Sequence, residues 1–174
     1  QAGTPHLVVW EDFQCPACGD FEAAFGPTVD ELAAGGDAQV IFRSTSFLDQ
    51  NFPGDNSKRA AAAFGCAVDA GKGPEYKKVV YANQPATEGD GWTDQQLLAF
   101  GEQAGITGDA KSTFDKCVTD RTYITWAVNG TEAMKAAGVP GTPGIYVNGE
   151  ELPDSARANP EAFKQAILDA AKNQ

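Results

Sequence analysis

Two of the four cysteines are separated by only two residues, in the motif Cys15-Pro16-Ala17-Cys18. The motif directly follows an apolar run, Leu-Val-Val-Trp at residues 7–10, and precedes a segment with helical periodicity. At the N-terminus of a helix, unpaired backbone N–H groups and the positive end of the helix dipole favour a thiolate, the reactive form of cysteine. We therefore expect Cys15 to attack from the exposed tip of the helix. Cys18, on the buried face, would resolve the mixed disulfide.

The main alternative for this motif is half of a zinc site. A zinc site of the ribbon type needs a second closely spaced pair of ligands, whereas Cys66 and Cys117 stand alone, 51 positions apart, and His6 is the only histidine. A bridge that merely braced the motif would add little stability, because the loop it closes is so short. The sequence therefore predicts no metal and no cofactor, and thiol–disulfide exchange as the chemistry.

A second feature lies far along the chain, in Gly-Val-Pro-Gly-Thr-Pro-Gly at residues 138–144. Pro143 cannot donate a ladder hydrogen bond, so it belongs at the entrance of a strand rather than inside one. A cis bond between Thr142 and Pro143 would expose backbone groups beside the cysteines, where an extended substrate peptide could pair with them. Taken alone, the segment is explained more simply as an ordinary turn.

The elements that position the motif follow from the apolar pattern. The uninterrupted run at residues 7–10 is typical of a strand buried on both faces. Pro16 can open a helix, Gly35-Gly36 can end it, and residues 38–47 have the composition of a second strand. A strand, a helix and a strand within about 40 residues predict a parallel pair with a right-handed crossover. The buried face of this helix is predicted to carry Cys18, Phe21, Phe25, Val29 and Leu32.

Residues 55–138 contain only helical patterns and short loops, which predicts a small helical subdomain. Asn56 or Ser57 is expected to cap its first helix, and Thr93-Asp94 a later one. Gly130 weakens the prediction of an unbroken last helix in this block.

Strand patterns return after the helical block. Residues 145–147 are apolar, and Asn148-Gly149 predicts a tight hairpin to residues 150–152. Asn159-Pro160 then begins a last helix. The predicted order is β-α-β, a helical block, and β-β-α, an α/β protein.

Length and composition limit the classes of function. The chain has 174 residues, 24 acidic and 13 basic, so its formal net charge is −11. This length suits one domain with an insertion, and the acidic excess argues against a nucleic-acid partner. No apolar run reaches the roughly 18 residues that a membrane span needs.

Residues 13–18, Phe-Gln-Cys-Pro-Ala-Cys, the helical block, and Gly141-Thr142-Pro143 ahead of the Asn148-Gly149 hairpin together resemble the DsbA-like thiol:disulfide oxidoreductases, in particular those of actinobacteria. The resemblance covers nearly the whole chain. It implies a thioredoxin fold with an inserted all-helical subdomain: residues 1–54 and 139–174 form the thioredoxin-like domain, and residues 55–138 the insertion. It further implies that Pro143 is a cis-proline that faces the active-site sulfurs.

The resemblance also implies a function. The chain would oxidise cysteine pairs of exported proteins or peptides and would itself be reoxidised by a membrane quinone-linked partner. It would act outside the cytoplasm as a monomer. Because it begins at Gln1 rather than Met, we expect that residues were removed ahead of it: a signal peptide, a membrane anchor that tethers the chain, or a cloning boundary. The alternatives are a reductase or isomerase on the same scaffold, and a non-catalytic peptide- or metal-binding module.

Two positions depart from the pattern of this family. Many relatives carry a buried glutamate six residues before the first active-site cysteine, where this chain has Val9. Glu11 or Asp12 is a candidate to take over proton transfer. Ala17 replaces the histidine of the best-known member and adds no charge that would stabilise a thiolate, so we expect a less acidic Cys15 and a milder oxidant.

Cys66 and Cys117 fall in two helices of the block. They could be inert core cysteines, which are common. In an exported protein an oxidising compartment favours a bridge between them, and related actinobacterial proteins carry a similar non-catalytic one. We expect a structural disulfide, which chain entropy predicts to contribute roughly 4 kcal/mol.

Overall fold

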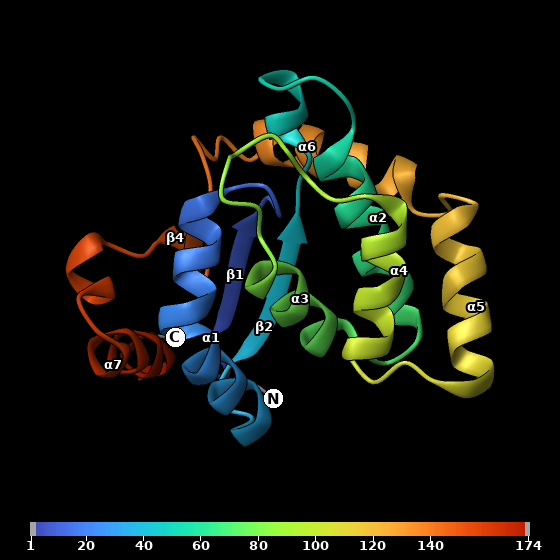
Figure 1. The fold of residues 1–174 in the computed structure, drawn as a ribbon. Helices are drawn as coiled ribbons and strands as arrows, with labels where there is room; N and C mark the ends of the chain where they lie inside the picture. The colour runs from blue at the N-terminus through green and yellow to red at the C-terminus, as the bar shows by residue number, and fades with distance from the viewer. Residues whose placement is uncertain (1–2, 173–174) are drawn as a thin grey trace.

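The computed structural model describes residues 3–172, and a four-stranded mixed sheet in the order β2-β1-β3-β4 lies at its centre (Figure 1). The central strand β1 (His6–Glu11) runs parallel to β2 (Gln39–Ser44). On its other side it pairs antiparallel with β3 (Gly144–Val147), and β4 (Glu150–Glu151) completes that edge. The predicted parallel pair is therefore confirmed, and the strand that carries the cysteine motif lies in the middle of the sheet.

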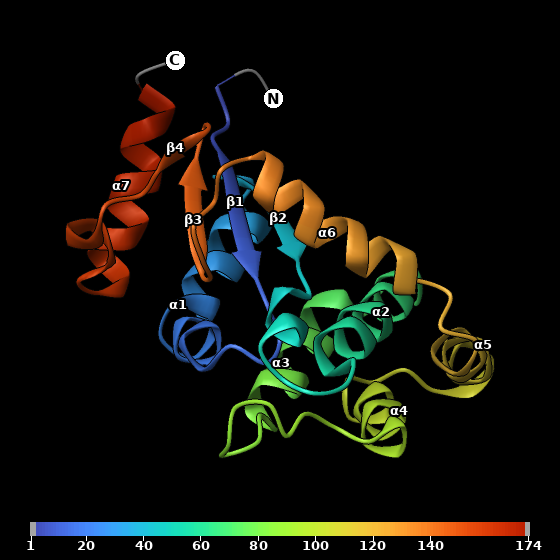
Figure 2. The same cartoon turned by 90° about the horizontal axis from the view of Figure 1, so that it is seen from above.

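Helices cover both faces of the sheet. Helix α1 (Pro16–Gly35) packs beside α7 (Pro160–Lys172) on one face, and α6 (Ile124–Ala136) crosses the other (Figure 2). Within the described residues, none of these helices has the length and apolar character needed to cross a membrane. The core under α1 and α7 contains Leu7, Val9, Phe21, Leu32, Ile145, Phe163 and Ile167, and the core under α6 contains Trp10, Met134 and Val139.

The predicted block of helices lies between the second and third strands, beside the β2 edge (Figures 1 and 2). It begins after a 3₁₀ turn, η1 (Phe47–Gln50), and shares a core of alanines and aromatic rings, among them Tyr76 and Phe114 at 5.5 Å between ring centroids. Its helices are α2 (Asn56–Asp69), α3 (Gly73–Ala82), α4 (Asp94–Gln103), α5 (Gly108–Thr119) and α6. The predicted thioredoxin fold with a helical insertion is confirmed. We propose to keep the domain boundaries at residues 55 and 138.

Several local predictions are also confirmed. Helix α1 ends at Gly35 with Gly36 in the left-handed conformation, and Thr93 caps α4 in a capping box with Gln96. Asn148 and Gly149 both have positive φ, as a two-residue hairpin turn requires. A second 3₁₀ turn, η2 (Asp154–Arg157), leads to α7.

Gly130 does not interrupt α6. A Cβ at this position would lie 2.2 Å from the Ser44 carbonyl oxygen, so the glycine lets the helix approach the end of β2.

Three local predictions are wrong. The second strand ends at Ser44 rather than residue 47, because Ser46 N donates to the Thr131 hydroxyl of α6 and draws the chain away from β1. Val8 is only half-buried, so β1 is not covered equally on both faces.

The cap of α2 is the third. The helix starts after Asp55, and neither Asn56 nor Ser57 caps it; instead Asp49 accepts hydrogen bonds from Ser57 N at 2.8 Å and Lys58 N at 3.0 Å.

Candidate active site

The cysteine motif lies where β1 gives way to α1. Cys15 is the N-cap residue of the helix, with extended backbone angles, and Pro16 occupies the first turn. The Cys15 carbonyl accepts hydrogen bonds from Cys18 N at 3.1 Å and Gly19 N at 3.2 Å, which closes that turn. Ala17 and Pro16 are exposed, whereas Cys18 is 2 % exposed. The local sequence therefore places both sulfurs at the positive end of the helix.

The expectation that Cys15 lies at an exposed tip is wrong. Its residue exposure is only 7 %. The segment before β3 passes over it, and the Cys15 thiol can donate to the Thr142 carbonyl at an Sγ–O distance of 3.4 Å. The Thr142–Pro143 bond is cis. The structure thus brings Thr142 and Pro143 beside the cysteine motif across 127 positions of sequence.

The two thiols differ sharply in acidity. A hydrogen bond from the Cys18 thiol, another from Thr142, and the backbone N–H groups of Cys18 and Ala17 lower the pKa of Cys15 from 9.0 to about 6, although burial opposes the shift. The Thr142 hydroxyl is buried and has no other hydrogen-bond partner among the described residues. Burial raises the pKa of Cys18, and the hydrogen bond to Cys15 and its charge raise it further. Cys15 can therefore be a thiolate at neutral pH while Cys18 stays protonated.

Buried carboxyl groups lie at the end of β1, although Val9 itself is buried in the apolar core. Burial raises the pKa of Glu11, against the opposing charge of Lys77, whose Nζ lies 3.6 Å from Glu11 Oε2. Lys77 also forms an ion pair with Glu22 of α1. Burial raises the pKa of Asp12 to about 7, against hydrogen bonds from Ser57 and two backbone N–H groups.

Sequence reasoning missed Lys77 and Glu22. Each does carry a signal: Glu22 follows Cys18 by four positions on the buried face of α1, and Lys77 stands between the buried Tyr76 and Val80 on α3. A charged residue within an apolar helical stripe requires a buried partner. Only the packing of α1 on α3 identifies that partner.

The active-site loop is also tied to the insertion. Asp12 Oδ1 accepts from Gln14 N at 3.0 Å and from Ser57 Oγ at 2.6 Å, and Gln14 Nε2 donates to Ser57 and Asp49. Phe13 packs against Phe64 and Tyr81, two aromatic rings of the insertion. Because the loop is bonded through its side chains on this flank, its backbone is held rigidly below the sulfurs.

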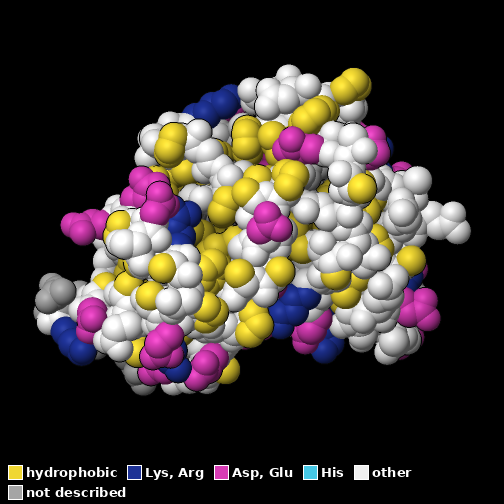
Figure 3. Space-filling view, turned by 60° about the vertical axis from the view of Figure 1, so that its left-hand side comes forward, with side chains coloured by type: hydrophobic (Ala, Val, Ile, Leu, Met, Phe, Trp, Pro, Cys, Tyr) yellow, Lys and Arg dark blue, Asp and Glu magenta, His cyan; other side chains and the backbone are white. Residues whose placement is uncertain are grey.

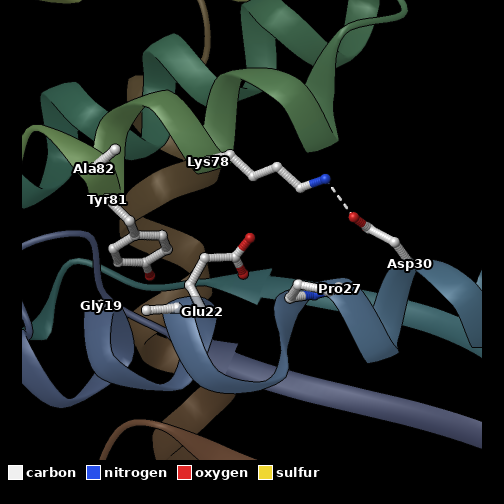
Figure 4. Close-up of a pocket in the computed structure, with 8 residues that line it drawn as sticks. Gly19, Glu22, Pro27, Asp30, Lys78, Tyr81 and Ala82 are labelled. Atoms are coloured by element: carbon white, nitrogen blue, oxygen red, sulfur yellow. Dashed lines mark hydrogen bonds and ion pairs between the residues drawn. The ribbon is translucent and has the colours of Figure 1, made fainter.

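A cleft of about 390 Å³ separates α1 from α3 next to this loop (Figure 4). Gly19 lies at its end nearest the cysteines, Glu22 and Tyr81 face it from the two helices, and an ion pair between Lys78 and Asp30 spans it. The cleft therefore connects Glu22, the partner of buried Lys77, with solvent.

Cys66 and Cys117 form a disulfide with a Cα–Cα distance of 5.8 Å, joining α2 to α5. Cys15 and Cys18 are free thiols. The bridge belongs to the insertion and is not part of the cysteine motif. Within residues 3–172, no group of three or more His, Cys, Asp or Glu side chains is arranged to hold a metal ion.

Comparison with known proteins places the chain in a family. The family model described as thioredoxin matches residues 1–169, and no curated protein sequence matches the chain. Oxidised DsbA of Mycobacterium tuberculosis is 29% identical with a TM-score of 0.80, and covers 97% of this chain and 83% of its own. The reduced disulfide bond oxidoreductase DsbG of the same organism is 28% identical, with a TM-score of 0.79 and coverages of 98% and 84%.

The thiol-disulfide oxidoreductase MdbA of Actinomyces oris has a TM-score of 0.79 at 18% identity, covering 96% of this chain and 81% of its own, so it supports the fold alone. The expected resemblance is thereby confirmed. The chain belongs to the thioredoxin family and is a protein-disulfide oxidoreductase of the DsbA-like type.

Proposed function

We propose that this protein oxidises pairs of cysteine thiols in exported proteins through a disulfide between Cys15 and Cys18. The observation that carries the proposal is the difference between the two sulfurs: Cys15 has a pKa of about 6 at the start of α1, and the pKa of Cys18 is raised. A stabilised thiolate belongs to the reduced form, and a disulfide whose reduced form is stabilised is an oxidant.

The exchange proceeds in two balanced steps. A substrate thiolate attacks Cys15 Sγ of the oxidised protein, a mixed disulfide forms, and Cys18 leaves as a thiolate that takes up one proton. The second substrate thiolate then attacks the substrate sulfur of the mixed disulfide and expels Cys15. Its low pKa makes Cys15 the better leaving group of the two cysteines. The substrate loses two electrons and the protein gains them.

We assign proton delivery to Cys18 to Glu11 rather than Asp12. The Asp12 carboxylate already accepts three hydrogen bonds, from Gln14 N, Leu48 N and the Ser57 hydroxyl, which suit a fixed anion. Glu11 shares Lys77 with Glu22, which lines the cleft, so a proton can be replaced from solvent. Burial raises the pKa of Glu11 toward the range where it can exchange a proton at neutral pH.

Substrate binding is assigned to Thr142 and Pro143. Their backbone lies against the Cys15 sulfur at the entrance of β3, where an extended peptide can pair with it. On the face seen in Figure 3, hydrophobic side chains form a band across the middle, and most acidic side chains lie around it. Such a face suits contact with the apolar residues of an unfolded chain.

The potential gained from thiolate formation is modest. A pKa of about 6 in place of 9.0 stabilises the reduced protein at pH 7 by at most about 1.4 kcal/mol, about 30 mV for a two-electron couple. Exposed Ala17 adds no charge to increase it. The proposal is therefore a milder oxidant than a relative with histidine at this position.

The resemblance to DsbA-like enzymes supports reduced exported proteins as substrates, a location outside the cytoplasm and reoxidation by a membrane quinone-linked partner. The Cys66–Cys117 disulfide supports an oxidising compartment, because such compartments preserve structural bridges. We propose that the protein works as a monomer.

Equilibration with glutathione tests the direction of the reaction. We expect a potential clearly above that of thioredoxin, about −270 mV, and catalysed oxidation of a dithiol peptide. A potential near the thioredoxin value would make the protein a reductase, and net shuffling of scrambled disulfides without oxidation would make it an isomerase. The Cys15→Ser variant is the control, and equal activity in it would remove Cys15 from the mechanism.

A further inference from the structure

The insertion contacts the backbone of the active-site loop through one side chain that the redox chemistry does not use. Gln84 follows the C-terminus of α3, at the start of the loop to α4. Its Nε2 donates to the Phe13 carbonyl at 2.8 Å and to the Cys15 carbonyl at 2.9 Å. Both hydrogens of the amide group therefore bind backbone oxygens on either side of Gln14.

The segment that presents this amide is itself held in place. Gln84 N donates to the Tyr81 carbonyl at 3.1 Å, and the indole N–H of buried Trp92 donates to the Asn83 carbonyl at 2.9 Å. Pro85 restricts the backbone of Gln84 to extended conformations. The amide is thus anchored to the insertion.

Gly19 of α1 supplies an independent observation. A Cβ at this position would lie 2.5 Å from Gln84 Oε1, which is closer than non-bonded atoms approach. Gly19 lies inside a helix, where alanine is the better helix former. Figure 4 shows Gly19 on the side of α1 that faces α3. The glycine leaves room for the Gln84 amide at a site where helix propensity alone would favour a side chain.

The bonded carbonyls control the surroundings of the reactive sulfur. The Cys15 carbonyl belongs to the Cys15–Pro16 peptide, and it also accepts the first hydrogen bonds of α1, from Cys18 N and Gly19 N. The orientation of this peptide determines where the N–H groups of Ala17 and Cys18 point, and both stabilise the Cys15 thiolate. Rotation of the peptide would move the sulfur away from them.

We propose that Gln84 is a positioning residue for Cys15: by holding the Phe13 and Cys15 carbonyls, it fixes the first turn of α1 around the reactive sulfur, and Gly19 leaves it room to do so. The inference deepens the proposed function and rests on Cys15 as the attacking sulfur. It makes the insertion a contributor to redox chemistry as well as a cover for the active site.

The test is a double-mutant cycle in the whole protein. Gln84→Met keeps the length of the side chain and removes the donor, and Gly19→Ala displaces the amide from the other side. Each variant is expected to raise the pKa of Cys15, followed by the ultraviolet absorbance of its thiolate, by about 0.5–1 unit, the size of one lost hydrogen bond. The equilibrium with glutathione at pH 7 should move about three- to fivefold toward the oxidised protein.

Because both substitutions act on one contact, the double variant should shift the pKa no further than either single variant. Gln95→Met, on the exposed surface of α4, is the matched control and should change neither quantity. Unchanged values in Gln84→Met, with a wild type that titrates near 6, would overturn the role of Gln84, and additive shifts would overturn the role of Gly19. A wild-type thiol that titrates near 9 would instead remove the assignment of Cys15 itself.

Discussion

The stability of the reduced protein should depend on pH through Cys15. Folding depresses the pKa of this thiol from 9.0 to about 6. A depressed acid stabilises the folded state fully above the unfolded pKa, and the contribution is lost as pH falls through the folded pKa. The relevant window therefore runs from about pH 9 down to about pH 6, and the reduced protein gains stability as pH rises through it.

The size of this effect follows from the two pKa values. At pH 5 the thiol is protonated in both states, and the contribution is below about 0.1 kcal/mol. At pH 8 it reaches about 2.7 kcal/mol, because the folded state has lost its proton and the unfolded state has kept it. The oxidised protein has no Cys15 thiol and should lack this contribution.

Urea unfolding of reduced wild type and reduced Cys15→Ser at pH 5 and pH 8 measures the effect. The variant shares the titration of the buried carboxyl groups and any reduction of the Cys66–Cys117 bridge, so the difference between the two proteins isolates Cys15. We expect the free energy of unfolding of wild type, relative to the variant, to rise by about 2.5 kcal/mol between the two pH values. A rise below about 0.5 kcal/mol would refute the claim that the fold holds a thiolate here.

Three further outcomes are expected. Thr142→Val removes a buried hydroxyl that stabilises the thiolate and should raise the pKa of Cys15, seen in its ultraviolet absorbance, by about half a unit; Thr142→Ser should keep the wild-type value. Glu11→Gln removes the assigned proton donor and should slow dithiol-peptide oxidation by at least about tenfold in stopped-flow fluorescence, and an unchanged rate would exclude it. Replacing Cys66 and Cys117 by alanine opens a closed loop with a separation of 51 and should cost about 4 kcal/mol in urea unfolding, with the thiolate titration unaltered.

The cysteine motif could be placed from sequence because its geometry is local. An apolar run must be a buried strand, Pro16 suits only the start of a helix, and three positions on a helix turn bring Cys15 and Cys18 to one side. The capping box at Thr93 and the turn at Asn148-Gly149 were predictable for the same reason. In each case residues within a few positions determine the backbone.

The prediction of an exposed Cys15 failed because exposure is not local. The segment that covers the sulfur comes from Thr142, which reaches it only when β3 pairs with β1. The loss of the buried glutamate at Val9 was visible in the sequence, but the carboxyl groups that take its place were only candidates. Their pKa values depend on Lys77 and Ser57, which lie on two different helices of the insertion.

The sequence by itself determined the reactive motif, the α/β order, the helical insertion and the family, because these depend on residue type, short spacing and periodicity. Tertiary structure decided the acidity of Cys15, the burial of Glu11 with Lys77 and the contact of Gln84 with the active-site loop. Each of these is an interaction between groups tens of positions apart, and its strength depends on burial and distance. Periodicity places such groups on a face of a helix, but only the packing of one element on another decides which of them meet.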